Sequence, residues 1–177
     1  MNRFPALDAQ QMSESQHQLL SAAGNATGGP FWPMLRSPDL ARAAKAVRLA
    51  LRDSVLPADL QEMAILTIAA ACDCPGQFNA HLPLARAAGL AEEAIEGSRA
   101  EFSLPDHLGR EQLIRTACRE LVDRRQLSTA TWDSLEQALG EQAVVELIGF
   151  AGFYSWMAMV MNTDRPNDER RSNNELS

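Results

Sequence analysis

The sequence has few cysteines and no concentration of basic residues. Its three cysteines, Cys72, Cys74 and Cys118, are too few and too oddly numbered for a disulfide framework. The 16 Lys and Arg residues are outnumbered by 23 Asp and Glu, and no stretch places basic residues beside aromatic ones. The formal net charge is −7. We therefore expect no nucleic-acid partner.

Signals for export and membrane insertion are also missing. The opening stretch MNRFPALDAQ lacks the continuous apolar core of a signal peptide, and no apolar run approaches the ~18 residues of a membrane span. These absences predict a cytoplasmic protein with no membrane partner. The length of 177 residues fits one globular domain.

Strand signals are nearly absent, because no segment alternates cleanly between apolar and polar side chains. Helix starts are marked instead by capping residues and by prolines at first helical positions, and several ends are marked by glycines. Between about residues 28 and 37 we expect a loop. Pro83 lies inside a predicted helix and favours a bend there. The predicted helices cover about 13–24, 37–53, 57–72, 74–88, 91–100, 106–125, 128–140 and 141–161.

Two of these helices are apolar on nearly every side. The run MAILTIAAA, residues 63–71, has Thr67 as its single polar side chain, which predicts a buried helix. The helix at 141–161 is interrupted by Glu146 and is too short and too interrupted for a membrane span. Its Met-rich, aromatic surface predicts a core helix or a subunit contact. The polar segment from residue 163 onward is predicted to be disordered.

One carboxylate and one imidazole stand out in this frame. Glu62 immediately precedes the apolar run, and burying its charge costs several kcal/mol unless the group is paired or protonated. On the next helix Cys74, Gln77 and His81 lie at i, i+3 and i+7, so they share a face. A short connection predicts an antiparallel pair of helices that brings Glu62 toward His81. Cys74 at the helix start is placed to favour a thiolate.

The segment LPADLQEMAILTIAAACDCPGQFNAHLPLARAAGL is similar to the core motif of the carboxymuconolactone decarboxylase superfamily, which includes the alkylhydroperoxidase D-like proteins. Those proteins show a glutamate on one helix, then a Cys-x-x-Cys pair and a histidine on the next. The spacing of Glu62 and His81 matches, Cys74 falls on the first cysteine, and Gln77 falls on the second. The wider chain resembles a larger subgroup of this superfamily that carries the motif Glu-Trp-x-x-His. This sequence differs from that motif at its first two positions, where it has Gln77 and Phe78.

The resemblance implies an all-α, alkylhydroperoxidase D-like helical bundle that forms a single domain. It covers residues 28–162, preceded by an N-terminal helix and tail at 1–27 and followed by a disordered tail at 163–177. It also implies a homo-oligomer, a trimer or hexamer, that uses no cofactor. No pair of residues has metal-ligand spacing such as HExxH, so we expect no metal.

The function implied is that of a cofactor-independent acid–base lyase, related to carboxymuconolactone decarboxylase, on a small carboxylate-bearing or lactone substrate. His81 is its acid or base and Glu62 orients it, while Gln77, Phe78 and Tyr154 are expected at the substrate. One alternative is an alkylhydroperoxidase D-like thiol peroxidase that uses Cys74 with Cys72 or an external thiol. Gln77 argues against a peroxidase, because an amide side chain can neither attack peroxide nor form a disulfide. Another is a non-catalytic helical module that binds a small molecule.

The same residues also have purely structural interpretations. Glu62 fits a first-turn acid or a buried ion pair with an arginine such as Arg86. His81 fits a core histidine bonded to a carbonyl. Cys118 is expected in the core, and His17 and His107 are expected at the surface.

Overall fold

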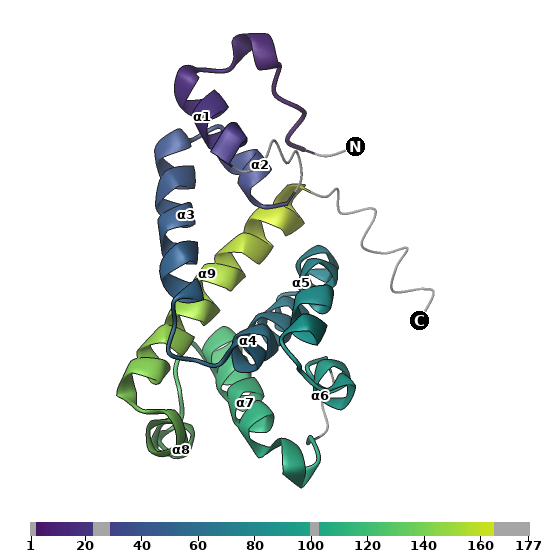
Figure 1. Cartoon of the computed structure of the whole chain (residues 1–177), viewed down its shortest axis with the longest axis vertical. Coiled ribbons are helices and arrows are strands. Elements are labelled where there is room, and N and C mark those ends of the chain that lie inside the picture. Colours follow the sequence, from purple (N-terminus) through teal and green to yellow (C-terminus); the bar gives the residue numbers. More distant parts are fainter. Residues whose placement is uncertain (1–2, 23–28, 100–102, 165–177) are drawn as a thin grey trace.

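The computed structural model describes residues 3–22, 29–99 and 103–164, and this part of the chain contains helices and no strand. The all-α prediction is confirmed. Figure 1 shows α9 passing between α3 on one side and the α4 and α5 pair on the other. The α-helices are α1 (Glu14–Ala22), α2 (Phe31–Met34), α3 (Pro38–Arg52), α4 (Ala58–Ala71), α5 (Pro75–Ala87), α6 (Glu92–Gly97), α7 (Gly109–Arg124), α8 (Thr129–Leu139) and α9 (Glu141–Asp164).

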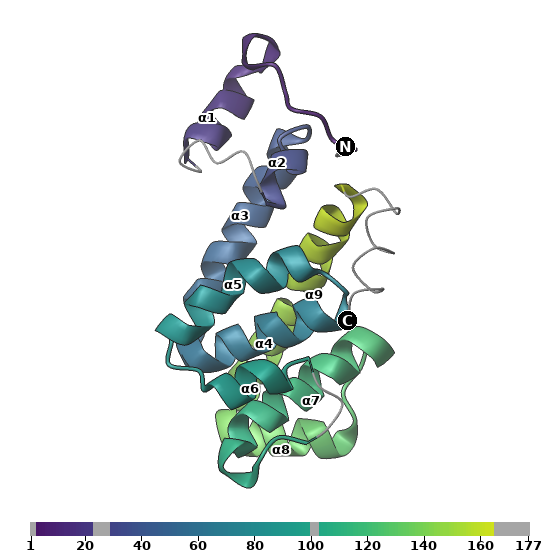
Figure 2. The same ribbon diagram turned by 90° about the vertical axis from the view of Figure 1, so that its right-hand side faces the viewer.

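The core is centred on α4, which contacts α5, α7 and α9 (Figure 2). The side chains from Met63 through Ala69 are all buried, as the apolar run predicted. A helix that is apolar all round is stable only when other helices cover it. The partners supply that cover with one continuous cluster of aliphatic and aromatic side chains.

Several local signals in the sequence are confirmed. Ser13 and Gln16 form the predicted capping box, with Ser13 N donating to Gln16 Oε1 at 2.8 Å and Gln16 N donating to Ser13 Oγ at 3.3 Å. Gly89 follows α5 with φ +85°, a left-handed conformation that glycine adopts without a steric penalty. The predicted end of the first helix near residue 24 lies outside the described residues.

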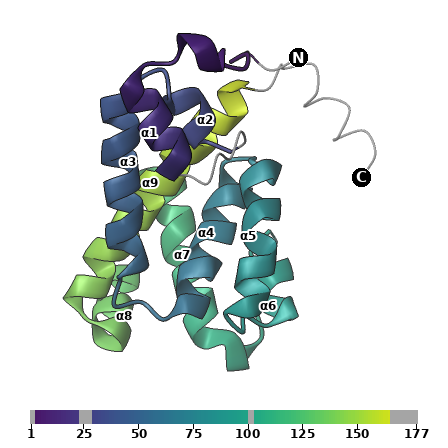
Figure 3. The same ribbon diagram turned by 45° about the horizontal axis from the view of Figure 1, so that its top comes forward.

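The loop predicted between residues 28 and 37 is wrong, because α2 occupies part of it. This turn of helix buries Trp32, Pro33 and Met34. Isolated four-residue helices are unstable in water, so tertiary packing holds this one. It lies with α1 near the start of α3, as Figure 3 shows.

The last helix also differs, since α9 continues through Thr163 to Asp164, where the sequence predicted a tail. The N-terminal segment explains the extension. Arg3 N donates to the Asp164 carbonyl at 2.8 Å, and Phe4 N donates to Asp164 Oδ1 at 2.9 Å. The final carbonyls of a helix need such donors, and here Arg3 N supplies one for the carbonyl of Asp164. The rest of the predicted tail, 165–177, lies outside the described residues.

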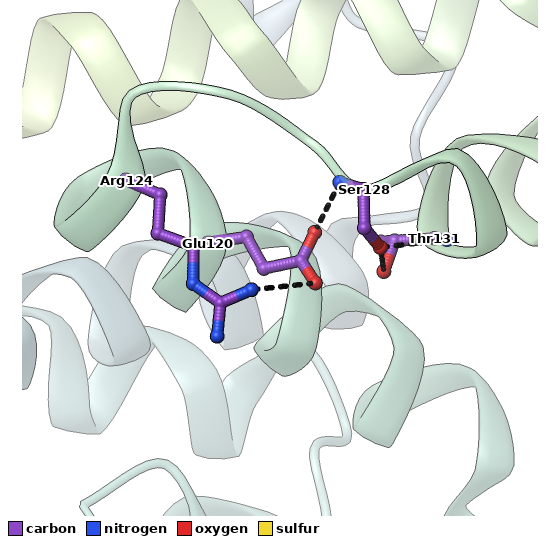
Figure 4. A network of polar contacts seen from close by, with 4 residues as sticks. All are labelled: Glu120, Arg124, Ser128 and Thr131. Carbon is purple, nitrogen blue, oxygen red and sulfur yellow. Dashed lines mark hydrogen bonds and ion pairs between the residues drawn. The ribbon is translucent and has the colours of Figure 1, made fainter.

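The junction of α7 and α8 is held by the polar network of Figure 4. Ser128 caps α8 by accepting from Thr131 N, and Glu120 Oε2 accepts from Ser128 N at 2.7 Å. Burial opposes the charge of Glu120, but hydrogen bonds from Ser128 and Thr131 together with Arg124 lower the pKa of this carboxyl group. Glu120 thereby fixes the start of α8.

By length and composition, α9 is the one helix among the described residues that meets the criteria for a membrane span. The sequence had indicated a helix too short and too interrupted for that. In the fold α9 packs against α3, α4, α5, α7 and α8, which is the environment of a core helix.

Candidate functional site

The pair predicted from the sequence meets in the fold. His81 Nδ1 on α5 lies 2.9 Å from Glu62 Oε2 on α4. The side chains are 19% and 15% exposed, so the pair is shielded but within reach of a small molecule. Arg86, the alternative partner for Glu62, instead binds Glu92 through Nε at 2.6 Å. The carboxylate occupies Nδ1, which leaves Nε2 as the ring nitrogen that can exchange a proton with a substrate.

Tyr154 on α9 completes a three-residue cluster. Its ring meets the His81 ring edge to face, with 5.4 Å between centroids. Burial, followed by the charge of Glu62, raises the pKa of the Tyr154 hydroxyl to about 12, against the opposing effect of Arg48 and Arg52. The hydroxyl therefore stays protonated at neutral pH. The sequence placed Tyr154 at the substrate, and the structure places it beside the proposed acid or base.

Sequence reasoning missed the two arginines of α3. Arg48 and Arg52 are one helical turn apart and both act electrostatically on Tyr154. The guanidinium of Arg48 lies over the Phe31 ring, 5.9 Å from its centroid, and its buried Nε has no hydrogen-bond partner among the described residues. Their i, i+4 spacing was visible in the sequence, but their approach to α9 was not.

Gln77 lies one turn before His81 and is 3% exposed. Its Nε2 and Oε1 are both buried without a hydrogen-bond partner among the described residues. Buried amides are rarely left in this state. The expectation that Gln77 contributes a polar contact near His81 stays a prediction.

Cys74 and Phe78 line a different space. Cys74 is the residue before α5 and is 1% exposed. The Arg99 guanidinium stacks on the Phe78 ring at 3.6 Å from its centroid. Glu62, His81 and Tyr154 take no part in this pocket of about 240 Å³, which is lined by Ala69, Ala70, Asp73, Cys74, Pro75, Phe78, Asn79 and Arg99.

The cysteines are all present as thiols. Cys72 is half-buried, with Sγ 3.7 Å from Ser155 Oγ. Cys118 lies in the core as predicted, and burial raises the pKa of its thiol.

His17 and His107 are exposed, also as predicted. Across residues 3–22, 29–99 and 103–164 no group of three His, Cys, Asp or Glu side chains is arranged to hold a metal ion.

The described residues thus define an all-α protein in which α4, α5 and α9 bring a carboxylate, an imidazole and a phenol together. Residues 38–100 match the model of the carboxymuconolactone decarboxylase family, which confirms the predicted resemblance to this superfamily. The matched segment runs from the start of α3 past α6 and contains Glu62 and His81, whereas Tyr154 lies beyond it. No curated protein and no solved structure matches the chain. The wider domain, residues 28–162, stays a prediction.

Proposed function

We propose that the protein is a cofactor-independent acid–base enzyme, a lyase of the carboxymuconolactone decarboxylase type acting on a small carboxylate-bearing or lactone substrate. The observation that supports this most directly is the 2.9 Å contact between His81 Nδ1 and Glu62 Oε2. A carboxylate on one ring nitrogen fixes the orientation of the imidazole. The other nitrogen then serves as acid or base toward the substrate.

The proposed reaction is a decarboxylation. The bond between the carboxylate carbon and its neighbour breaks, carbon dioxide leaves, and the electron pair passes into the conjugated system of the substrate. Protonated His81 delivers a proton from Nε2 to the carbon that lost the carboxylate, and solvent restores that proton. Tyr154 keeps its proton at neutral pH because its pKa is about 12, so its hydroxyl donates to the carbonyl oxygen on which negative charge develops.

The test is turnover of a panel of small carboxylated lactones, measured as release of carbon dioxide. His81→Ala should lower kcat at least about 100-fold, as loss of a general acid–base typically does. His107→Ala is the matched control, because that imidazole is at the surface and faces Glu93. Wild-type activity in His81→Ala would contradict the proposal. Binding without turnover by wild-type protein would favour the non-catalytic alternative.

A thiol peroxidase is the competing enzyme class. It requires a cysteine that reacts with peroxide, and Cys74 is buried in a pocket that His81 does not line. Peroxide consumption that is lost in Cys74→Ser would establish this class, whereas consumption that survives the substitution would exclude Cys74 as the attacking group.

We also propose a cytoplasmic homo-oligomer, a trimer or hexamer, with α9 at a subunit contact. Exposed apolar side chains on α9 support this, since Val145 is 61% and Met159 is 60% exposed. Ile148, one turn after Val145, is also 44% exposed, and neighbouring large apolar side chains on a surface are typical of interfaces. Light scattering after size exclusion should give three or six times the 19.4 kDa chain mass, and Val145→Lys should lower it.

A further inference from the structure

Arg48 has an unusual environment for a positive charge. Its Nε is buried and has no hydrogen-bond partner, and the part of the chain that the structure describes gives its guanidinium no carboxylate at ion-pair distance. Burying part of a charged donor without an acceptor is unfavourable. A bound ligand that carries a hydrogen-bond acceptor would satisfy this donor.

The surroundings hold this guanidinium in place. Phe31 on α2 lies against it at 5.9 Å, which favours a fixed orientation of the cation over the ring. Arg52 follows at i+4, so both side chains leave the same face of α3. That helix packs against α9, which carries Tyr154. The two cations of α3 both act electrostatically on Tyr154, whose ring contacts the His81 ring.

The charges around this cluster are complementary to an anion. The carboxylate in the cluster, Glu62, is engaged by His81 Nδ1 at 2.9 Å. Arg42 on the same helix differs, because it is paired with Asp39. Within the described residues, neither Arg48 nor Arg52 forms an ion pair with a carboxylate. Guanidinium groups bind planar carboxylates through parallel N–H donors, and they also bind phosphate.

We propose that Arg48 and Arg52 form an anion subsite that binds a carboxylate of the substrate and places its reacting carbon at His81 and Tyr154. The reaction at that carbon rests on the function proposed above, but anion binding does not. The expected substrate is therefore a small molecule with two groups. Its anionic group binds to the arginines of α3, and its reacting group lies between His81 on α5 and Tyr154 on α9. An uncharged ester or amide of the same molecule lacks the negative charge and the two equivalent oxygens with which a guanidinium group pairs.

The experiment is isothermal titration calorimetry of the full chain with benzoate and succinate as carboxylate probes and with inorganic phosphate as the second anion. Wild type should bind a carboxylate. Arg48→Gln and Arg52→Gln should each raise its Kd at least tenfold, while Arg42→Gln changes it less than twofold. Circular dichroism checks the fold, and Arg52→Gln tests the subsite independently should Arg48→Gln fail to fold. Tighter binding of phosphate than of either carboxylate would overturn the carboxylate assignment.

His81→Ala separates the two proposals, since it should keep carboxylate binding within about threefold of wild type while removing turnover. Arginine-dependent binding without turnover in any variant would leave the subsite standing and contradict the lyase. Turnover that persists with unchanged KM in both arginine variants would leave the lyase standing and overturn the subsite. Failure of wild type to bind any of the three anions would also overturn it.

Discussion

His81 Nδ1 and Glu62 Oε2 are 2.9 Å apart although the two residues are separated by 19 positions in the chain. The contact exists because α4 and α5 fold back on each other across a tight turn at residues 72–74. Asp73 in this turn has φ +48°, a left-handed conformation that an aspartate adopts more readily than bulkier residues. The turn thereby sets the register in which the carboxylate meets the imidazole.

Tyr154 is the single tyrosine of the sequence, so its ionisation can be followed alone by the absorbance of tyrosinate. We expect a midpoint near pH 12, because burial and the Glu62 carboxylate raise its pKa to about 12. Replacing Glu62 by Gln should lower the midpoint, and replacing Arg48 by Gln should raise it further. A wild-type midpoint near 10, the ordinary value for tyrosine, would contradict the described packing of this side chain.

The same shift predicts a loss of stability at high pH. The folded protein holds the Tyr154 proton more tightly than the unfolded chain, so this contribution is complete below about pH 10 and decreases as pH rises toward 12. Urea unfolding between pH 9 and pH 12 should show the decrease in wild type. The decrease should be smaller in Tyr154→Phe, which has no proton to lose at this position.

Glu120 should stabilise the protein at neutral pH. Glu120→Gln removes the carboxylate that accepts from Ser128 N, at an expected cost of about 1 to 2 kcal/mol in the free energy of unfolding. The folded pKa is lowered, so the stabilisation is present above the unfolded value of about 4.5 and is lost as pH falls below it. The difference between variant and wild type should therefore shrink at pH 3. Glu136→Gln, at an exposed position on α8, should change stability little at either pH.

Gly97 tests the packing around α6. A Cβ at this position would lie 2.0 Å from Leu104 Cδ2, so Gly97→Ala should destabilise the fold by about 1 to 3 kcal/mol in urea unfolding. The cost should be smaller in a Leu104→Ala background, where that methyl is absent. Gly152 is the control, because a Cβ there meets nothing within 4 Å. Alanine at this interior helical position should be neutral or stabilising by up to about 1 kcal/mol.

The thiols should differ in accessibility. Cys72 is half-buried, whereas Cys74 and Cys118 are buried. We expect one thiol to react quickly with a chromogenic disulfide reagent in the native state and three after denaturation. Cys72→Ser should remove the fast phase. A fast phase that disappears instead in Cys74→Ser would show that the pocket around Cys74 opens, and it would strengthen the peroxidase alternative.

Local features of the fold were predictable because they depend on neighbours in the chain. The capping box of Ser13 and Gln16, the cap at Ser128 and the glycine at residue 89 each act within a few positions. Long-range contacts explain the misses. A short helix formed where a loop was expected, because Trp32 and Met34 are buried. The last helix continues to Asp164, because the backbone N–H groups of residues 3 and 4 donate to this residue.

By itself the sequence determined an all-α chain, a buried helix preceded by Glu62, and a family spacing that pairs this residue with His81. The first two follow from hydrophobic periodicity and helix signals, which are local, and the pairing follows from the short connection between the helices and from the family resemblance. Only the tertiary structure decided that Tyr154 faces His81, that Cys74 lines another pocket, and that Arg48 and Arg52 on α3 act electrostatically on Tyr154. The contact of Tyr154 with His81 depends on how α5 and α9 pack, and the effect of the two arginines on Tyr154 depends on how α3 and α9 pack. These helices are far apart in the chain, so no periodicity along the sequence encodes the distance between their residues.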